Sequence, residues 1–260
     1  MKKYEFTGET KRVELWNRTT TLHRIKATVE FGFVKVGELG GWIEKEENLS
    51  HEGKAWVCDD AKVCGDAKVW GNAKVWGNAE VCGDAKVCDD AKVCGDAKVW
   101  GNAEVCDDAK VCGDAKVWGN AKVCGDAKVW GNAKVCGDAE VWGNAEVCGD
   151  AEVCGDAKVW GNAKVCGDAK VWGNAKVCGD AEVFLASHVL VMGSVGSRND
   201  FTTFFRDKDN EITVKCGCFL GKIDKFLEKV TQTHGNNKYA LVYRAAVEVA
   251  KLQIELTERK

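Results

Sequence analysis

A six-residue period runs through the middle of the chain and limits what it can fold into. Valine recurs at every sixth position from Val57 to Val183, which makes an array of 22 successive units, and alanine stands two residues before each valine. A typical unit reads Ala, Lys or Glu, Val, Cys or Trp, Gly, and then Asp or Asn. A glycine in almost every unit and a β-branched valine in all of them disfavour a helix. The alternation of apolar and polar residues instead predicts a short, half-buried strand in each unit.

The repeat predicts a parallel β-helix. Gly followed by Asp or Asn forms a turn because these residues tolerate positive φ. Hexapeptide periods are typical of β-helices, so we expect an all-β solenoid in which three hexads close one coil. The Val and Ala side chains then face inward, whereas Lys or Glu and Cys or Trp face outward. Each buried valine contributes about 1.5–3 kcal/mol, so stability comes from stacking many coils.

Composition divides the chain into three parts. We expect a β-rich N-terminal cap over residues 1–54, the β-helix over 55–198 and a small α+β C-terminal module over 199–260. Alternating runs such as RVELW, at residues 12–16, indicate strands in the cap. A cap is needed because an uncovered first coil would expose unpaired strand edges and apolar core.

The end of the repeat and the start of the C-terminal module are predicted to be β-structure. The hexad pattern decays after the array, although Val189 and Val195 still hold its register. Two strand-like runs follow at residues 201–206 and 211–219, on either side of the turn DKDN. This arrangement predicts a β-hairpin.

The rest of the C-terminal module is predicted to be helical. Apolar residues at helical spacing indicate helices over 222–234 and 238–260, separated by the turn GNN. Cys216, Cys218 and His234 belong to residue types that ligate metals. A C-x-C pair with one distant histidine is an unspecific pattern, so we favour a capping role for this hairpin and these helices.

The outward tryptophans are the candidate binding residues of the array. Residues 18 positions apart lie on the same face in adjacent coils, so Trp100 stacks on Trp118 and Trp142 on Trp160. These pairs could bind a saccharide or an aromatic ligand, or they could simply cover the sheet as cross-strand pairs do. Every Trp that follows a repeat valine is itself followed two residues later by Asn, and every such Cys by Asp. We interpret that linkage as a record of the duplication of two short modules.

The cysteines and the acidic turns do not indicate a metal site or a cofactor. The chain has 15 cysteines, and their strict repeat differs from the irregular spacing of short secreted disulfide scaffolds, so reduced thiols are expected. Cα distance alone would permit disulfides between adjacent coils, but a reducing cytosol opposes them. Cys88, Cys106 and Cys124 line up, but thiols in a row diverge from the tetrahedral geometry of zinc. Four aspartates cluster where two turns replace Gly by Asp, and they indicate a solvated corner rather than a Ca²⁺ site: Asp89, Asp90, Asp107 and Asp108.

Charge and hydropathy argue against two classes of partner. The net charge is −3 and no basic run stands out, so we expect no nucleic-acid binding. The chain has neither an apolar signal segment at its start nor an apolar span of about 20 residues. We therefore expect no membrane interaction and a cytoplasmic location.

The junction between the cap and the array resembles a known group. The segment GELGGWIEKEENLSHEGKAWVCDDAKV, residues 37–63, resembles bacterial and prophage hexapeptide-repeat proteins of the YdcK-like type. That resemblance implies a left-handed β-helix and acetyl transfer from acetyl-CoA to a hydroxyl or amine, with a histidine as general base. The CGCF…THG…Y pattern near the C-terminus resembles a module that accompanies such arrays and implies no particular activity.

The distribution of histidines argues against that activity. Only His23, His51, His188 and His234 occur, so no histidine lies within the hexads from Ala55 to Asp180, and no inserted loop shapes an acceptor pocket there. His188, just after the array, is the remaining candidate for a catalytic base. We therefore expect a non-catalytic structural or interaction protein that binds a protein or saccharide partner. The alternative is an acetyl-CoA-dependent O- or N-acyltransferase, and homo-oligomerisation stays open.

Overall fold

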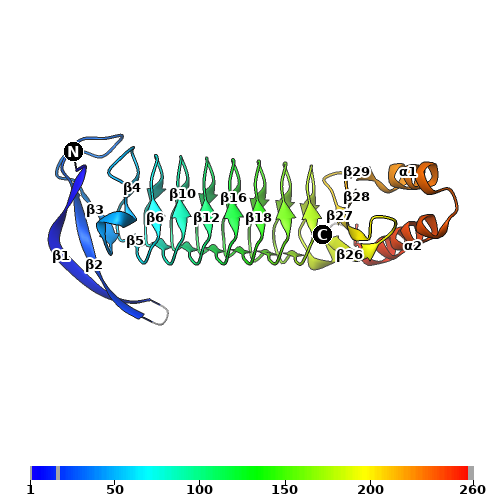
Figure 1. Cartoon of the computed structure of the whole chain (residues 1–260), viewed down its shortest axis with the longest axis horizontal. Helices are drawn as coiled ribbons and strands as arrows, with labels where there is room; N and C mark the ends of the chain where they lie inside the picture. The colour runs from blue at the N-terminus through cyan, green and yellow to red at the C-terminus, as the bar shows by residue number, and fades with distance from the viewer. Residues whose placement is uncertain (1, 16–17, 257–260) are drawn as a thin grey trace.

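The repeat forms a rod of stacked coils (Figure 1). The computed structural model describes residues 2–15 and 18–256. Strands 18 residues apart pair in parallel and in register, as where Lys98 lies opposite Lys116 and Val99 opposite Val117. The predicted fold class is confirmed: a left-handed parallel β-helix with three hexads per coil, a β-rich N-terminal cap and a small α+β C-terminal module.

Each hexad contributes one two-residue strand, which ends at its valine. The 22 strands are β4 (Trp56–Val57), β5 (Lys62–Val63), β6 (Lys68–Val69), β7 (Lys74–Val75), β8 (Glu80–Val81), β9 (Lys86–Val87), β10 (Lys92–Val93), β11 (Lys98–Val99), β12 (Glu104–Val105), β13 (Lys110–Val111), β14 (Lys116–Val117), β15 (Lys122–Val123), β16 (Lys128–Val129), β17 (Lys134–Val135), β18 (Glu140–Val141), β19 (Glu146–Val147), β20 (Glu152–Val153), β21 (Lys158–Val159), β22 (Lys164–Val165), β23 (Lys170–Val171), β24 (Lys176–Val177) and β25 (Glu182–Val183). Every third strand belongs to the same sheet, so three flat sheets enclose the core.

The interior of the tube is filled by alanine and valine along the array. Each repeat Val and Ala from Ala55 to Val183 is at most 1% exposed. Because neighbouring strands pair in register, each valine lies directly beside the valines of the coils before and after it. The predicted inward direction of these side chains is confirmed, and it places Lys or Glu and Cys or Trp on the outside.

The turns are tight and stacked. Gly119, for example, has φ +77°, a conformation that L side chains rarely adopt. Asn and Asp side chains form ladders along the corners: Asn102 Nδ2 donates to Asn120 Oδ1 at 3.0 Å, and Asn120 Nδ2 donates to Asp138 Oδ1 at 2.8 Å. An Asn stacked beside an Asp therefore supplies a hydrogen-bond donor, which two stacked Asp carboxylates would lack.

The N-terminal cap extends one sheet of the solenoid. Strands β1 (Tyr4–Leu15) and β2 (Arg18–Ala27) form an antiparallel hairpin, and β3 (Leu39–Ile43) joins β2 to β5. The 3₁₀ helix η1 (Glu46–Asn48) follows. The predicted run at residues 12–16 is strand as far as residue 15, and residue 16 lies outside the described residues.

The C-terminal module closes the other end of the rod with a four-stranded antiparallel sheet. After the 3₁₀ helix η2 (Ala186–His188), its strands are β26 (Val189–Val195), β27 (Asp200–Arg206), β28 (Ile212–Cys216) and β29 (Phe219–Lys222). The helices α1 (Ile223–His234) and α2 (Lys238–Gln253) follow.

Three predicted secondary-structure segments near the C-terminus differ from the structure. Residues 189–195 do not continue the hexad register, because β26 pairs antiparallel with β27. The run 211–219 is not one strand, because Gly217, at φ +57°, turns the chain between β28 and β29. The expected second helix ends at Gln253, and residues 257–260 lie outside the described residues.

Two adjacent phenylalanines of β27 join the module to the rod. Phe205 is fully buried in the core of the solenoid, whereas Phe204 is fully buried in the second core, with α1 and α2. This division follows from the alternating direction of side chains along a strand. Thr203 Oγ1 also accepts a hydrogen bond from the Lys176 backbone at 3.0 Å, and Arg206 donates to the Glu182 carbonyl at 3.1 Å. The helices thus reach the last coil through the sheet.

Candidate functional site

The two predicted tryptophan pairs are stacked, but they do not form one surface. The Trp100 and Trp118 rings lie 5.1 Å apart and the Trp142 and Trp160 rings 5.2 Å apart, each pair within 4° of parallel. Trp100 and Trp118 follow β11 and β14, whereas Trp142 and Trp160 follow β18 and β21 of a different sheet. A small ligand of one pair therefore cannot contact the other.

The Trp100–Trp118 pair lines a shallow groove of about 470 Å³, whose lining also includes Glu152, paired with Lys134 at 2.8 Å. Three stacked lysines line the same groove, and they come from the in-register strands β11, β14 and β17: Lys98, Lys116 and Lys134. Aromatic faces beside ammonium groups can stack on a sugar or hold an anionic group.

The candidate base His188 is buried and holds the turn after the array in place. Its side chain is 4% exposed, and its Nδ1 accepts a hydrogen bond from the Phe184 backbone N–H at 3.2 Å. The ring also meets the Phe184 ring edge-on, with centroids 6.3 Å apart. His188 lines neither the tryptophan groove nor the pocket of the C-terminal module. A general base must reach the proton that it removes, and this burial works against that role.

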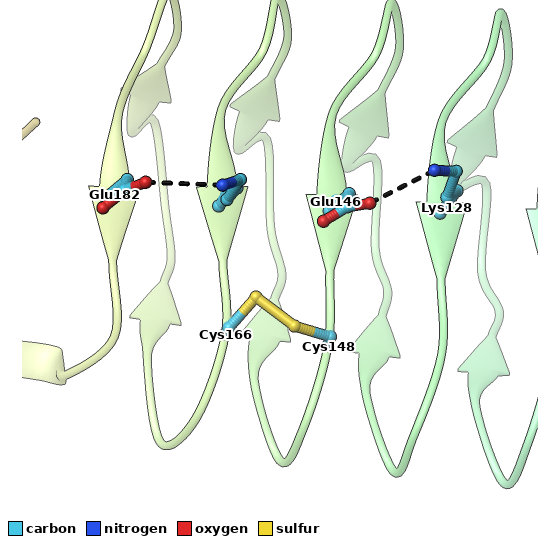
Figure 2. The surroundings of a disulfide bond; sticks show 6 residues. Lys128, Glu146, Cys148, Cys166 and Glu182 are labelled. Atoms are coloured by element: carbon cyan, nitrogen blue, oxygen red, sulfur yellow. Dashed lines mark hydrogen bonds and ion pairs between the residues drawn. A yellow bond between two sulfur atoms is a disulfide. The ribbon is translucent and has the colours of Figure 1, made fainter. Parts of the chain in front are cut away.

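The outer cysteines are the feature that the sequence reasoning misjudged. Stacked cysteines come within bonding range, because Cys136–Cys154 and Cys148–Cys166 are disulfides with Cα atoms 4.6 and 4.5 Å apart. Figure 2 shows the second bond spanning adjacent coils beside the ion pair of Lys128 and Glu146. The expectation that all array thiols are reduced is therefore wrong for these four.

Several reduced cysteines are also paired or covered. Cys64 and Cys82 are buried, with sulfurs 2.6 Å apart, and the sulfurs of Cys94 and Cys112 are also 2.6 Å apart. Cys178, although it faces outward from the coil, is only 1% exposed beneath the C-terminal module. Outward direction thus does not mean exposure, since neighbouring coils and the end modules cover many of these sulfurs.

A signal for this pairing is present in the sequence. Every array cysteine except Cys58 and Cys178 has another cysteine 18 residues away. The cysteines stack in groups of two or three, so no face of the rod carries a continuous row of them. Counting neighbours at the coil period identifies every pair.

The free thiols are predicted to differ in reactivity. In the reduced protein, the hydrogen bond from Cys94 lowers the pKa of Cys112 to about 7, whereas burial raises the pKa of Cys178 to about 11. Because the thiolate is the nucleophile, we expect iodoacetamide at about pH 7.5 to alkylate Cys112 at least about 100-fold faster than Cys178. Peptide mass spectrometry over time measures both rates. Urea should equalise them, and equal rates in the folded protein would contradict the assignment.

The C-terminal module contains a pocket of about 480 Å³ between its sheet and α1. Cys216, Cys218 and His234 all line it, so the structure brings these sequence candidates into one cavity. Each has a separate partner: Cys216 Sγ accepts from Thr202 Oγ1 at 3.2 Å, Cys218 Sγ from Arg198 at 3.8 Å, and His234 Nε2 lies 3.2 Å from Ser197 Oγ.

The aromatic and basic lining gives this pocket its chemical character. His234 stacks on Tyr243, with ring centroids 5.9 Å apart, and Arg198 and Lys229 add positive charge. Burial is the largest cause that raises the pKa of Tyr243, so its hydroxyl stays protonated. The pocket therefore suits a small anionic or aromatic group.

Comparison with known proteins adds no assignment. The chain matches neither a model of a known protein family nor any of the curated proteins. Within residues 2–15 and 18–256, no helix has the length and apolar character needed to cross a bilayer.

Proposed function

We propose that the chain is a non-catalytic β-solenoid scaffold of the bacterial and prophage hexapeptide-repeat kind. In this role, a rigid rod holds the C-terminal module at a set distance and orientation from the N-terminal cap. The observation that carries the proposal is the uninterrupted array, in which β4 to β25 recur at six-residue intervals with no inserted loop. A stack whose every coil hydrogen-bonds to the next resists bending, since a bend would break pairs along one face.

Two surfaces are the proposed places of contact with a protein or saccharide partner. The groove of Trp100 and Trp118 lies on the side of the rod, and the pocket with Arg198 and Tyr243 lies in the C-terminal module. Both combine aromatic rings with positive charge. This combination favours recognition of a sugar or of an acidic group on a partner protein.

The pocket lacks one element of a hydrolytic or acyl-transfer site. Ser197 Oγ lies 3.2 Å from His234 Nε2, which is the contact that a nucleophile and its base would make. A base of this kind is usually oriented by a third group, most often a carboxylate. Among the described residues that line the pocket, none is Asp or Glu. This composition supports binding rather than catalysis.

Calorimetric titration with acetyl-CoA separates the scaffold from the acyltransferase alternative. We expect no heat of binding to the full chain at ligand concentrations up to about 1 mM, the upper range of enzyme KM values. Saturable binding that is lost in His188→Ala would overturn the proposal and favour an acyltransferase. His23→Ala is the matched control, because His23 lies in the distant N-terminal hairpin.

Removal of whole coils tests the rod itself. Deletion of residues 73–126 removes three complete coils and joins Asn72 to Ala127 in the correct register. Because every hexad supplies the same Ala and Val core, we expect the shortened chain to fold. Its maximum dimension in small-angle scattering should fall by about 14 Å, at about 4.8 Å per coil. Collapse or aggregation of the shortened chain would contradict a modular rod.

A further inference from the structure

One column of outer cysteines differs from all the others. Cys88, Cys106 and Cys124 follow β9, β12 and β15, and they make the array's only stack of three cysteines. Two successive turns beside this column carry Asp in place of Gly, at Asp89 and Asp107. An odd number of thiols cannot all pair as disulfides. The column therefore calls for a different explanation from the paired cysteines elsewhere.

Three ligand atoms converge at this column. One donor atom each from Cys106, Asp107 and Cys124 lies within 4.8 Å of the others, and no other such group of three occurs in the described parts of the chain. The spacing of coils alone predicted divergent thiols. Asp107 alters that geometry because it lies in the turn directly after Cys106 and its carboxylate reaches the Gly125 N–H of the next coil.

Asp107 takes the turn position that Gly occupies in most of the other hexads. Its φ is +57°, a left-handed conformation that Asp adopts more readily than most side chains, and Asp59 and Asp89 adopt it in the equivalent turns. One carboxylate oxygen accepts a hydrogen bond from the Gly125 N–H at 3.0 Å and lies 3.9 Å from Cys106 Sγ. Asp59 makes the equivalent bond to the Gly77 N–H at 3.0 Å, so the contact belongs to this kind of turn, and at Asp107 it holds the carboxylate beside two stacked thiols.

The surroundings favour a cation. Asp107 is exposed and both cysteines are half-buried, so an ion can enter from solvent. Glu104 and Glu140 are close enough to act electrostatically on Cys124, but Lys122 lies in register between them and Glu140 pairs with Lys158 at 3.1 Å. The negative charge at the cluster therefore comes mainly from Asp107, which attracts a divalent ion.

We propose that Cys106, Asp107 and Cys124 bind a thiophilic divalent cation of the Zn²⁺ class. Two thiolates and one carboxylate supply three ligands, and water completes a tetrahedron. Binding releases the two thiol protons to solvent, with no change in oxidation state. Zn–S bonds of about 2.3 Å place tetrahedral sulfurs about 3.8 Å apart, so side-chain rotation suffices to close the cluster. This site goes beyond the scaffold role and would bind two coils of the rod together.

The disulfide alternative is distinguishable. The cysteines of the two disulfides are each followed by Gly, at Gly137, Gly149, Gly155 and Gly167. A disulfide between Cys106 and Cys124 would likewise form with Gly in place of Asp107. Dependence of binding on this carboxylate therefore separates a metal site from a cysteine pair.

The test is a Zn²⁺ titration of the reduced full-length protein under anaerobic conditions. We expect the first equivalent of Zn²⁺ to protect Cys106 and Cys124 from alkylation before the Cys94 and Cys112 pair, as read by peptide mass spectrometry. Co²⁺ in place of Zn²⁺ should give the intense visible absorption of tetrahedral thiolate coordination. Equal protection of all cysteine pairs by the first equivalent would overturn the proposal.

Two glycine variants make a matched comparison. Asp107→Gly restores the usual turn, so it should fold, and it should weaken the first Zn²⁺ site at least tenfold. Asp59→Gly changes an equivalent turn, at φ +55°, whose Cys58 stacks on Trp76 rather than on a cysteine, and it should leave affinity unchanged. Unchanged affinity in Asp107→Gly would reduce the site to an ordinary thiol pair and refute the inference.

Discussion

Substitution of Val117 by aspartate is expected to destabilise the rod by more than about 4 kcal/mol. Val117 is 0% exposed and lies in register between Val99 and Val135, so a carboxylate there has neither water nor a partner cation. The defect also removes the nearest-neighbour contacts on both sides, which carry the stability of a solenoid. Urea denaturation followed by circular dichroism measures the loss, and limited proteolysis should cut near residue 117.

The control for this substitution is one residue away. Lys116 lies on the opposite face of the same strand, between Lys98 and Lys134. Lys116→Asp introduces the same carboxylate outside the tube, where it relieves like-charge contacts, so stability should change by less than about 0.5 kcal/mol or increase. Similar losses for both variants would show that the sheet, rather than burial in the tube, determines the effect.

The stacked turns provide the second large effect. Gly119 has φ +77°, and a Cβ there would lie 2.9 Å from the Gly137 carbonyl oxygen and 3.0 Å from its nitrogen. Gly119→Ala should therefore combine a left-handed backbone penalty of about 1–2 kcal/mol with a steric cost of about 1–3 kcal/mol. We expect a total loss of about 2–5 kcal/mol in urea denaturation, because the next coil's backbone must shift.

Gly173 separates the two contributions, since it is the last glycine of the same column. It has φ +63°, but a Cβ added there would meet no atom within 4 Å. Gly173→Ala should cost only the backbone penalty, about 1–2 kcal/mol. If the two alanine variants lost equal stability, contact between successive turns would contribute nothing and the close stacking would be irrelevant to the rod.

The candidate sites were less predictable than the core. Position on a flat sheet correctly placed Trp100 over Trp118, because residues at the coil period are neighbours. For the cysteines, the spacing of coils permitted disulfides, but the strict repeat and an expected reducing compartment favoured reduced thiols, whereas Cys148 and Cys166 are bonded. Reactivity depends on distances of a few ångströms and on rotamers, which a repeat pattern does not encode.

The six-residue period by itself determined the solenoid, its 18-residue coil and its Ala and Val core, because one alternating unit repeated without interruption has one way to bury its apolar face. Only the tertiary structure decided how the rod ends. Residues 189–195 could extend the array by pattern, yet they pair antiparallel with β27, and Phe205 enters the solenoid core while Phe204 faces the helices. The physical reason is that the last coil must be covered by segments distant in sequence. Those segments contain no repeat, so their packing cannot be predicted from a sequence period.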